Sequence, residues 1–241
     1  MDSLLVLVLA AGKSTRIHPV TGGLPKPLLP LAGLTVLERN LRWLAASGLT
    51  SAWVNLHQRP EAIRQVVGEG QRCGLLVRYS HEPEILGTAG ALRNLPESTR
   101  RTSLVVYGDN LVRFDLSALL ATHCSRGAEV TLALFDPCRH LHTGIAGGRA
   151  VLDEEGRLRQ FVEGAGQGLV NAGVYLVEPS ALDSIPPGGF CDFARDLFPR
   201  LLAQGRHLQG HVIDGYCLGL DTPEAYARAL ELVASGQVPL A

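Results

Sequence analysis

The N-terminal segment, residues 4–33, constrains the fold of this chain more than any other stretch. Six apolar residues, Leu4 to Leu9, follow one another without interruption and lead into Ala10, Ala11 and Gly12. An unbroken apolar run of this kind indicates a strand that is buried on both faces, as in a parallel sheet. The small residues that follow it predict a tight turn at the carboxyl end of that strand.

The predicted turn has the composition of an anion-binding loop. Residues 12–16 read Gly-Lys-Ser-Thr-Arg, and consecutive backbone N–H groups in such a turn can hold a phosphate. Arg16 lies four residues beyond Gly12 and can reach the same anion. Lys26 stands between two prolines, so we expect it on a stiff extended segment and not on a helix. The segment therefore offers two cations to a phosphate.

Two common phosphate-binding motifs do not fit this segment. The Walker A pattern G-x-x-x-x-G-K-[ST] would need a glycine where Leu7 lies inside the predicted strand. The dinucleotide fingerprint G-x-G-x-x-G would need glycines where Ser14 and Ile17 stand. The sequence therefore disfavours both a P-loop ATPase and a dinucleotide-binding loop.

Predicted strands and helices alternate through the first half of the chain. After the first strand, further strands are expected at residues 52–56, 75–79, 103–107 and 129–135. Helical spacing marks residues 36–47, 60–68 and 116–126, and a loop with a short helix covers 83–95. This alternation predicts a parallel sheet with right-handed crossover connections.

The second half is less regular and adds a hairpin. We expect paired strands at 149–152 and 158–162, strands at 169–177 and 208–213, and helices at 193–204 and 223–234. The loops between them read as insertions in one domain, residues 1–241, with no long C-terminal extension to carry another. The sequence thus predicts a single α/β domain in three layers, with helices on both faces of a mostly parallel mixed sheet.

Composition limits the cellular compartments and the classes of partner that we expect for this chain. The 241 residues are 46% hydrophobic with a formal net charge of −1, which gives no electrostatic case for nucleic acid or an anionic membrane. The apolar start is too short for a signal peptide or a membrane span. Five scattered cysteines without a C-x-x-C pair favour free thiols in a reducing cytoplasm. The eight histidines form no H-E-x-x-H motif, and neither pair of close histidines indicates a metal site.

The opening segment resembles the signature of the sugar-phosphate nucleotidylyltransferases, A-A-G-x-G-T-R-x-x-P-x-T followed by P-K-P. Residues 10–21 read Ala-Ala-Gly-Lys-Ser-Thr-Arg-Ile-His-Pro-Val-Thr, and residues 25–27 read Pro-Lys-Pro. The resemblance implies the Rossmann-like fold of nucleotide-diphospho-sugar transferases, with Arg16 and Lys26 as catalytic residues. It assigns nucleotide binding to Leu9, Ala10, Ala11, Gly12, Lys13, Ser14 and Thr15. Ser14 departs from the pattern, because it replaces the usual second glycine.

A second landmark is Gly108-Asp109-Asn110, at the end of the strand predicted over 103–107. Ligands of open α/β sheets bind at the carboxyl ends of strands, where the Asp109 carboxylate could hold Mg²⁺. The matching aspartate of the family does so, which implies that Asp109 is both a catalytic residue and a metal ligand. The alternative is that Asp109 caps the helix that follows.

The second metal aspartate of the family comes from a late motif, W-x-D-x-G-T-P. The matching residues 217–223 read Cys-Leu-Gly-Leu-Asp-Thr-Pro, so Gly219 stands at the aspartate position. Side chains two residues apart on an extended strand point to the same side, so Asp221 could supply the missing carboxylate. The alternative is that Asp221 is the N-cap of the final helix.

Residues 82–92 resemble the base-recognition stretch of the family, E-x-x-L-G-T-A-G-A-L. They read Glu-Pro-Glu-Ile-Leu-Gly-Thr-Ala-Gly-Ala-Leu. The implied nucleotide-binding residues are Glu82, Gly87, Thr88, Ala89 and Gly90, with the glycines allowing the backbone to approach a flat base. This form looks more like the guanylyl- and uridylyltransferases than the thymidylyltransferases. The alternative is a glycine-rich helix start.

Two further strings resemble the sugar side of the family. Residues 161–163 match F-x-E, and residues 171–175 match N-A-G-x-Y. The implied sugar-binding residues are Asn110, Gly144, Glu163, Asn171 and Gly173. Gly164 occupies the place of a lysine that contacts the sugar phosphate in the family, which puts the affinity for that group in doubt. Glu163 as a surface carboxylate and Asn171 as a turn residue are the alternatives.

The resemblance implies a Mg²⁺-dependent enzyme that joins a nucleoside triphosphate to a sugar 1-phosphate. GTP with mannose 1-phosphate is the first expectation. Heptose, glucose and N-acetylmuramate phosphates stay open, as does a uridylyl- or cytidylyltransferase. One rival is a non-catalytic binding homologue, which would account for the departures at Ser14, Gly164 and Gly219. Another is a molybdopterin or alditol cytidylyltransferase, whose loop Ser14 fits. No nucleic acid or membrane partner is expected, and a homo-oligomer is left open.

Overall fold

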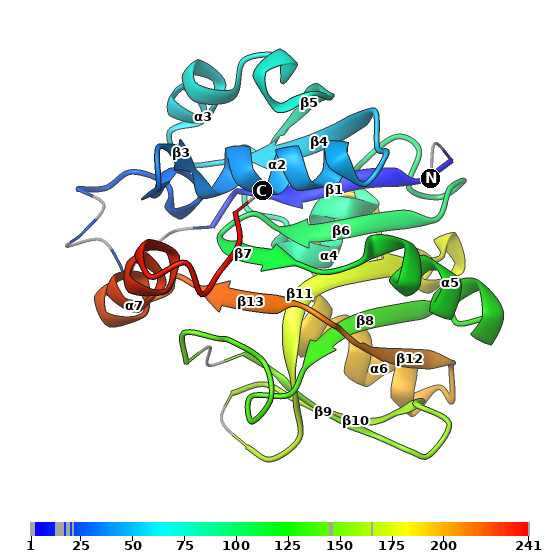
Figure 1. The fold of residues 1–241 in the computed structure, drawn as a ribbon. Helices are drawn as coiled ribbons and strands as arrows, with labels where there is room; N and C mark the ends of the chain where they lie inside the picture. The colour runs from blue at the N-terminus through cyan, green and yellow to red at the C-terminus, as the bar shows by residue number, and fades with distance from the viewer. Residues whose placement is uncertain are drawn as a thin grey trace.

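A mixed sheet forms the centre of the molecule (Figure 1). The computed structural model describes residues 3–12, 17, 20, 22–144, 147–164 and 166–240. Within these residues nine strands pair into one sheet. They are β1 (Leu5–Leu9), β4 (Ser51–Leu56), β5 (Leu76–His81), β6 (Ser103–Tyr107), β8 (Val130–Phe135), β9 (Arg149–Leu152), β10 (Leu158–Val162), β11 (Leu169–Val177) and β12 (Leu208–Val212).

The order of the strands confirms the predicted mostly parallel mixed sheet. The main path runs β10-β9-β11-β6-β1-β4-β5, and β8 pairs with both β11 and β12. Strands β10 and β11 run opposite to the others, as their antiparallel ladders with β9, β6 and β8 require. The hairpin of β9 and β10 was predicted from the turn residues between its strands.

Helices cover both faces of the sheet and make three layers (Figure 1). On one face lie α2 (Val36–Ala46), α3 (Pro60–Val67) and α5 (Leu116–Arg126). On the other lie α4 (Gly87–Arg93), the π-helical turn η5 (Phe193–Leu197) and α6 (Phe198–Ala203). Short 3-10 turns are η3 (Gln71–Cys73) and η4 (Pro179–Leu182). No helix of the described ranges combines the length and the apolar composition needed to cross a bilayer.

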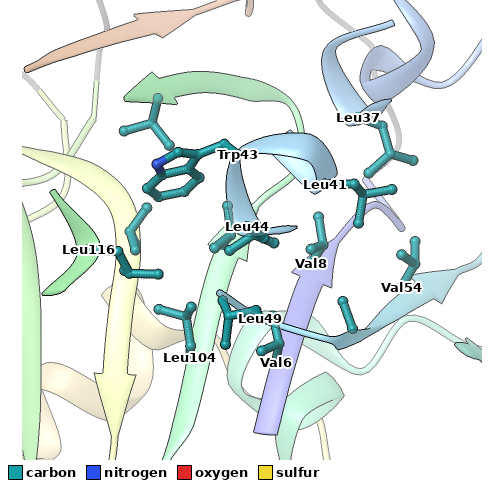
Figure 2. Close-up of a cluster of buried hydrophobic side chains, with 14 of the residues drawn as sticks. Val6, Val8, Leu37, Leu41, Trp43, Leu44, Leu49, Val54, Leu104 and Leu116 are labelled. Carbon is teal, nitrogen blue, oxygen red and sulfur yellow. The ribbon is translucent and has the colours of Figure 1, made fainter. Parts of the chain in front are cut away.

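Alternation along β1 explains why it is apolar throughout. Val6 and Val8 pack under Leu37 and Leu41 of α2, as Figure 2 shows. Leu7, with its neighbours at positions 5 and 9, faces the layer of α4 and α6. Because successive strand residues point to opposite faces, a strand covered on both sides needs apolar residues at every position.

Two strands that the sequence patterns do not predict form a separate antiparallel ribbon, β7 (Asn110–Arg113) and β13 (Tyr216–Gly219). The last helix, α7 (Pro223–Ala234), packs on this ribbon through Ala229 and Leu232. A third small unit pairs β2 (Pro30–Leu31) with β3 (Leu34–Thr35). Through this ribbon, the end of β13 lies beside the start of β7, close to the carboxyl end of β6.

Lys26 begins a short 3-10 helix, η2 (Lys26–Leu28), so the predicted extended conformation is wrong. The Leu28 N–H donates to the Pro25 carbonyl at 2.9 Å, and the Leu29 N–H donates to the Lys26 carbonyl at 2.9 Å. Proline fits the first turn of a helix, because its fixed φ suits the turn and its missing N–H has no partner there to lose. The flanking prolines still make the backbone under Lys26 stiff.

Glu129, just before β8, is joined to Arg206 by a two-pronged ion pair. The Arg206 Nε donates to both carboxylate oxygens of Glu129, at 2.7 and 2.8 Å, and Nη2 donates to Oε2 as well. The hydrogen bonds from Arg206 lower the pKa of Glu129 below its ordinary value of 4.5. The ionised carboxylate is therefore favoured in the folded chain, and its stabilisation is lost as the pH falls through the lowered pKa.

We expect Glu129→Gln to lower the free energy of unfolding at pH 7 by about 1 kcal/mol. In urea denaturation the difference from the unsubstituted chain should shrink as the pH falls below 4.5 and through the lowered pKa of Glu129, because the native carboxylate is then protonated. Glu231→Gln is the matched control, because its pair with Arg228 is exposed and should contribute little. A loss of stability for Glu129→Gln that stays the same as the pH falls would mean that packing and not charge sets the effect.

Candidate functional site

A cavity of about 590 Å³ opens at the carboxyl ends of β1 and β6. These strands pair in parallel, with Leu9 opposite Tyr107. The chain continues from β1 through α2 to β4 on one side, and β6 lies on the other side of β1. Connections that leave in opposite directions from neighbouring strands create a crevice, which is where open α/β sheets bind ligands.

The cavity brings together most of the residues predicted for the site. Its lining includes Leu9, Ala10, Ala11, Gly12, Lys26, Glu82, Gly87, Thr88, Asp109, Asn110, Glu163, Asn171, Gly173 and Asp221. Three predicted residues lie outside this lining. Ala89 and Gly90 are buried inside α4, and Gly144 is exposed. Gly147 and Gly148 contribute to the lining, although they were not predicted. Lys13, Ser14, Thr15 and Arg16 lie outside the described residues.

Lys26 meets Asp109 and Asp221 in the cavity. Its Nζ lies 3.3 Å from Asp109 Oδ2 and hydrogen-bonds Asp221 Oδ1. Burial alone would lower the pKa of Lys26, but the charges of the two carboxylates outweigh burial and raise it. Burial raises the pKa of Asp109, and the nearby Asp221 charge adds to this while Lys26 opposes it. The lysine is therefore held in its charged form between two acids.

The β7–β13 ribbon explains how the two carboxylates meet. Gly219 pairs with Asn110 in an antiparallel register. The residues that follow Gly219 therefore lie beside those that precede Asn110, and this brings Asp221 next to Asp109. This pairing brings together two residues that are far apart in the sequence.

Neither aspartate serves as a helix cap, which was the alternative for each. The N-cap of α7 is Thr222, whose hydroxyl accepts from the Ala225 N–H at 3.2 Å. The N-cap of α5 is Asp115, which accepts from the Ser117 N–H at 2.8 Å. Both Asp109 and Asp221 instead line the cavity.

Glu82 shapes the start of the loop after β1 through Asn55. The Asn55 Nδ2 donates to Glu82 Oε1 at 2.8 Å, and Asn55 Oδ1 accepts from the Ala10 N–H at 2.7 Å. Glu82 Oε2 accepts from the Leu86 N–H at 3.1 Å. Glu82 is 1% exposed, so each of these buried groups needs its partner. Asn55 was not predicted as a site residue, although an asparagine within an apolar strand is a signal that could have indicated it.

The glycines at positions 87 and 90 serve packing within the protein. A Cβ on Gly87 would lie 2.4 Å from the Cys191 carbonyl oxygen, and one on Gly90 would lie 2.5 Å from the Gly189 carbonyl oxygen. The N–H groups of Ala89 and Gly90 donate to the Cys191 carbonyl at 2.9 and 3.0 Å. The start of α4 is therefore held against the segment before η5. This close packing requires glycine at position 87 whether or not Gly87 also contacts a nucleotide base.

We expect Gly87→Ala to lower the free energy of unfolding by about 2–4 kcal/mol, because the new Cβ meets backbone and the residue keeps a left-handed φ. The φ of Gly87 is +76°. Gly205→Ala is the matched control, since Gly205 has a φ of +68° with open space around the Cβ position. The control should lose about 1 kcal/mol from strain alone. Equal losses in urea denaturation would contradict this role of Gly87 in packing.

The opposite wall of the cavity comes from β11. Asn171 lies inside this strand and is not a turn residue. Its Oδ1 accepts from the Gly173 N–H at 3.0 Å, and its Nδ2 donates to the Tyr175 hydroxyl at 2.5 Å. The register of β11 against β8 shifts between Asn171 and Tyr175. Gly173 has a φ of +73°, and a Cβ there would lie 2.9 Å from the Tyr107 ring, so only glycine fits this irregular stretch.

The segment that leads into η5 also lines the cavity, and none of its residues was predicted as part of the site. Phe190 is 68% exposed at the cavity, and Asp192 and Arg195 lie beside it. Partial burial raises the pKa of Glu163, the charge of Asp192 adds to this, and Arg195 opposes it. Arg195 and Lys26 are thus the cations in the described part of the lining. Gly164 has a φ of +97°.

The fold and the site define an α/β protein with a polar ligand cavity at the switch point of a mostly parallel sheet. The chain belongs to the nucleotidyl transferase family, whose model matches residues 5–235. This family membership confirms the resemblance that the sequence motifs indicate.

Relatives of known name support the same family. The chain is 35% identical to a mannose-1-phosphate guanylyltransferase of Mycobacterium tuberculosis, over 97% of this chain and 65% of that protein. It is 31% identical to a UTP–glucose-1-phosphate uridylyltransferase of Synechocystis, over 96% of this chain and 64% of that protein. The chain thus spans just under two thirds of the length of these relatives.

The fold is also found among crystal structures. The structure of HddC from Yersinia pseudotuberculosis, complexed with GMP-PN, superposes with a TM-score of 0.80 at 24% sequence identity. The match covers 95% of this chain and 99% of that one. The predicted Rossmann-like α/β fold is therefore confirmed.

Proposed function

We propose that this chain transfers a nucleotidyl group from a nucleoside triphosphate to a sugar 1-phosphate, giving a nucleotide sugar and pyrophosphate. The observation that carries the proposal is the buried Lys26 held against Asp109 and Asp221 in one cavity. Names of relatives at 35% and 31% identity support the same reaction. We take residues 1–241 as one nucleotidyltransferase domain, and its free cysteines suit the reducing cytoplasm.

The two carboxylates fit a divalent cation. Asp109 and Asp221 present hard oxygen ligands, and a cationic ammonium group already lies against both. Among the described residues, no three or more His, Cys, Asp or Glu side chains cluster so that they could hold a metal ion by themselves. Mg²⁺ is commonly held by one or two carboxylates together with substrate phosphates and waters, so two aspartates suffice. When bound, Mg²⁺ would neutralise phosphate charge and orient the phosphate oxygens.

Positioning and fixed charge account for the chemistry. An oxygen of the sugar 1-phosphate attacks the α-phosphorus, and the bond from that phosphorus to the bridging oxygen of the pyrophosphate breaks. Both reactants are anions, so repulsion and misalignment make up most of the barrier. Backbone groups of Ala11 and Gly12 border the cavity beside the triphosphate, and Lys26 neutralises charge that develops at the α-phosphate. Arg16 is assigned to the departing pyrophosphate by the sequence motif.

The far wall suits the acceptor. Glu163 and Asn171 offer oxygens to sugar hydroxyls, and the irregular backbone at Gly173 lets a ring approach closely. Arg195 lines the same wall, so we assign to it the sugar phosphate contact that Gly164 cannot make. On the other side Glu82, Gly87 and Thr88 border the space for the base. GTP with mannose 1-phosphate is the pair that we propose.

Pyrophosphate release from a panel of substrates tests this function. The purified protein is incubated with Mg²⁺, each of the common nucleoside triphosphates and each of several hexose and heptose 1-phosphates. We expect release that requires both substrates and is fastest with GTP and mannose 1-phosphate. Tight nucleotide binding without release from any pair would contradict the proposal and favour a non-catalytic binding protein.

A further inference from the structure

Lys26 contacts the two carboxylates that we assign to the metal, and we also assign this lysine to the phosphates of the nucleotide. The side chain of Lys26 is 10% exposed, whereas those of Asp109 and Asp221 are 28% and 26% exposed. The Lys26 side chain is therefore the most buried of the three, and its ammonium bonds to one oxygen of each carboxylate. In this arrangement the lysine N–H groups engage Asp109 Oδ2 and Asp221 Oδ1, so a metal ion held between these two oxygens would compete with the lysine for their lone pairs.

The positive charge of Lys26 also disfavours the binding of a metal ion between the two carboxylates. A divalent cation ligated by Asp109 and Asp221 would lie within a few ångströms of the ammonium, and like charges at that separation repel strongly in a partly buried site.

We propose that Lys26 guards the metal site. In the free protein its ammonium takes the place of the metal between Asp109 and Asp221. It leaves them when a nucleoside triphosphate offers phosphate oxygens in their stead, so the divalent cation binds with the nucleotide and not before it. This inference rests on the proposed function, because the nucleotide is the group that draws the lysine away.

The local structure permits this exchange without a backbone change. Lys26 begins the turn η2, whose two backbone hydrogen bonds and flanking prolines fix its Cα. The lysine side chain is a compact charge on a flexible four-carbon stem, so its end can move while its base stays in place. A triphosphate carries more negative charge than two carboxylates, and charge-assisted hydrogen bonds to phosphate are strong. The ammonium therefore gains a partner as it gives up two.

Mn²⁺ binding to the nucleotide-free protein tests the guard. Free Mn²⁺ is followed by electron paramagnetic resonance during titration of the unsubstituted chain, Lys26→Met, Lys26→Arg and Asp109→Asn. We expect Lys26→Met, which keeps the length and loses the charge, to bind Mn²⁺ about tenfold or more tightly than the unsubstituted chain. Lys26→Arg should bind Mn²⁺ as weakly as the unsubstituted chain, and Asp109→Asn more weakly.

A non-hydrolysable GTP analogue then tests the release. It should raise the Mn²⁺ affinity of the unsubstituted chain beyond that of the analogue alone, and raise that of Lys26→Met by a smaller factor. Equal Mn²⁺ affinity for the unsubstituted chain and a folded Lys26→Met, or Lys26→Gln if the methionine variant does not fold, would overturn the guard. Lys26→Met could bind Mn²⁺ more tightly in a protein that releases no pyrophosphate from any substrate pair. This result would support the proposed role of Lys26 at the metal site and would contradict the proposed enzymatic function.

Discussion

Lys26→Met is expected to lower turnover at saturating substrate at least a hundredfold, with the fold retained. The substitution removes a fixed positive charge at the place where negative charge develops, and one such group typically contributes a factor of about a hundred or more. Asp109 and Asp221 are each about one quarter exposed, and Mg²⁺ in the assay can neutralise them, so the fold should tolerate the loss. Pyrophosphate release measures turnover, and thermal unfolding measures the fold.

A matched control separates this effect from general loss of charge. Arg78→Met removes an exposed cation of β5 that lies outside the described cavity lining. Its turnover should equal that of the unsubstituted chain. Near-native turnover in Lys26→Met would remove this lysine from the mechanism, whatever its position between the carboxylates.

Asp109→Asn is expected to lower turnover at least a hundredfold at ordinary Mg²⁺ concentrations. The amide keeps the shape of the side chain and a hydrogen-bonding oxygen, but it removes the negative charge that we assign to the metal. Turnover measured across a Mg²⁺ titration should show both a lower maximum and a requirement for more metal.

Asp115→Asn provides the comparison for this aspartate. Asp115 lies six residues further along and caps α5, outside the described cavity lining. Its substitution should leave the Mg²⁺ titration unchanged, since asparagine also caps helices well. If Asp109→Asn gave the same Mg²⁺ titration as Asp115→Asn, Asp109 would be a structural carboxylate.

The parts of the fold that local pattern governs were predictable. The apolar run of β1 and the strand before Asp109 both follow from continuous burial, and α2 follows from its spacing and the Thr35–Glu38 capping box. The position of the loop after β1 beside Asp109 also follows, because the carboxyl ends of neighbouring parallel strands share one edge. These inferences need only a strand, its period and its end.

What was missed depends on pairing between distant segments. No local signal tells that β13 pairs with β7, and this pairing is what turns Asp221 toward Asp109. Arg195 reaches the cavity because η5 is clamped to α4, which a sequence pattern does not reveal. The extended conformation predicted for Lys26 was wrong because the restriction on a residue before proline is a tendency that a single 3-10 turn can override.

The central claim is that one cavity holds a triphosphate with Lys26 on its phosphates and a metal on Asp109 and Asp221. A crystal structure with Mn²⁺ and a non-hydrolysable GTP analogue tests it most directly, because anomalous scattering locates the metal. We expect the metal to lie at ligand distance, about 2.0–2.3 Å, from an oxygen of each carboxylate, with the Lys26 ammonium on phosphate oxygens. A nucleotide seated with its phosphates away from Lys26, or a metal that touches neither carboxylate, would contradict the account.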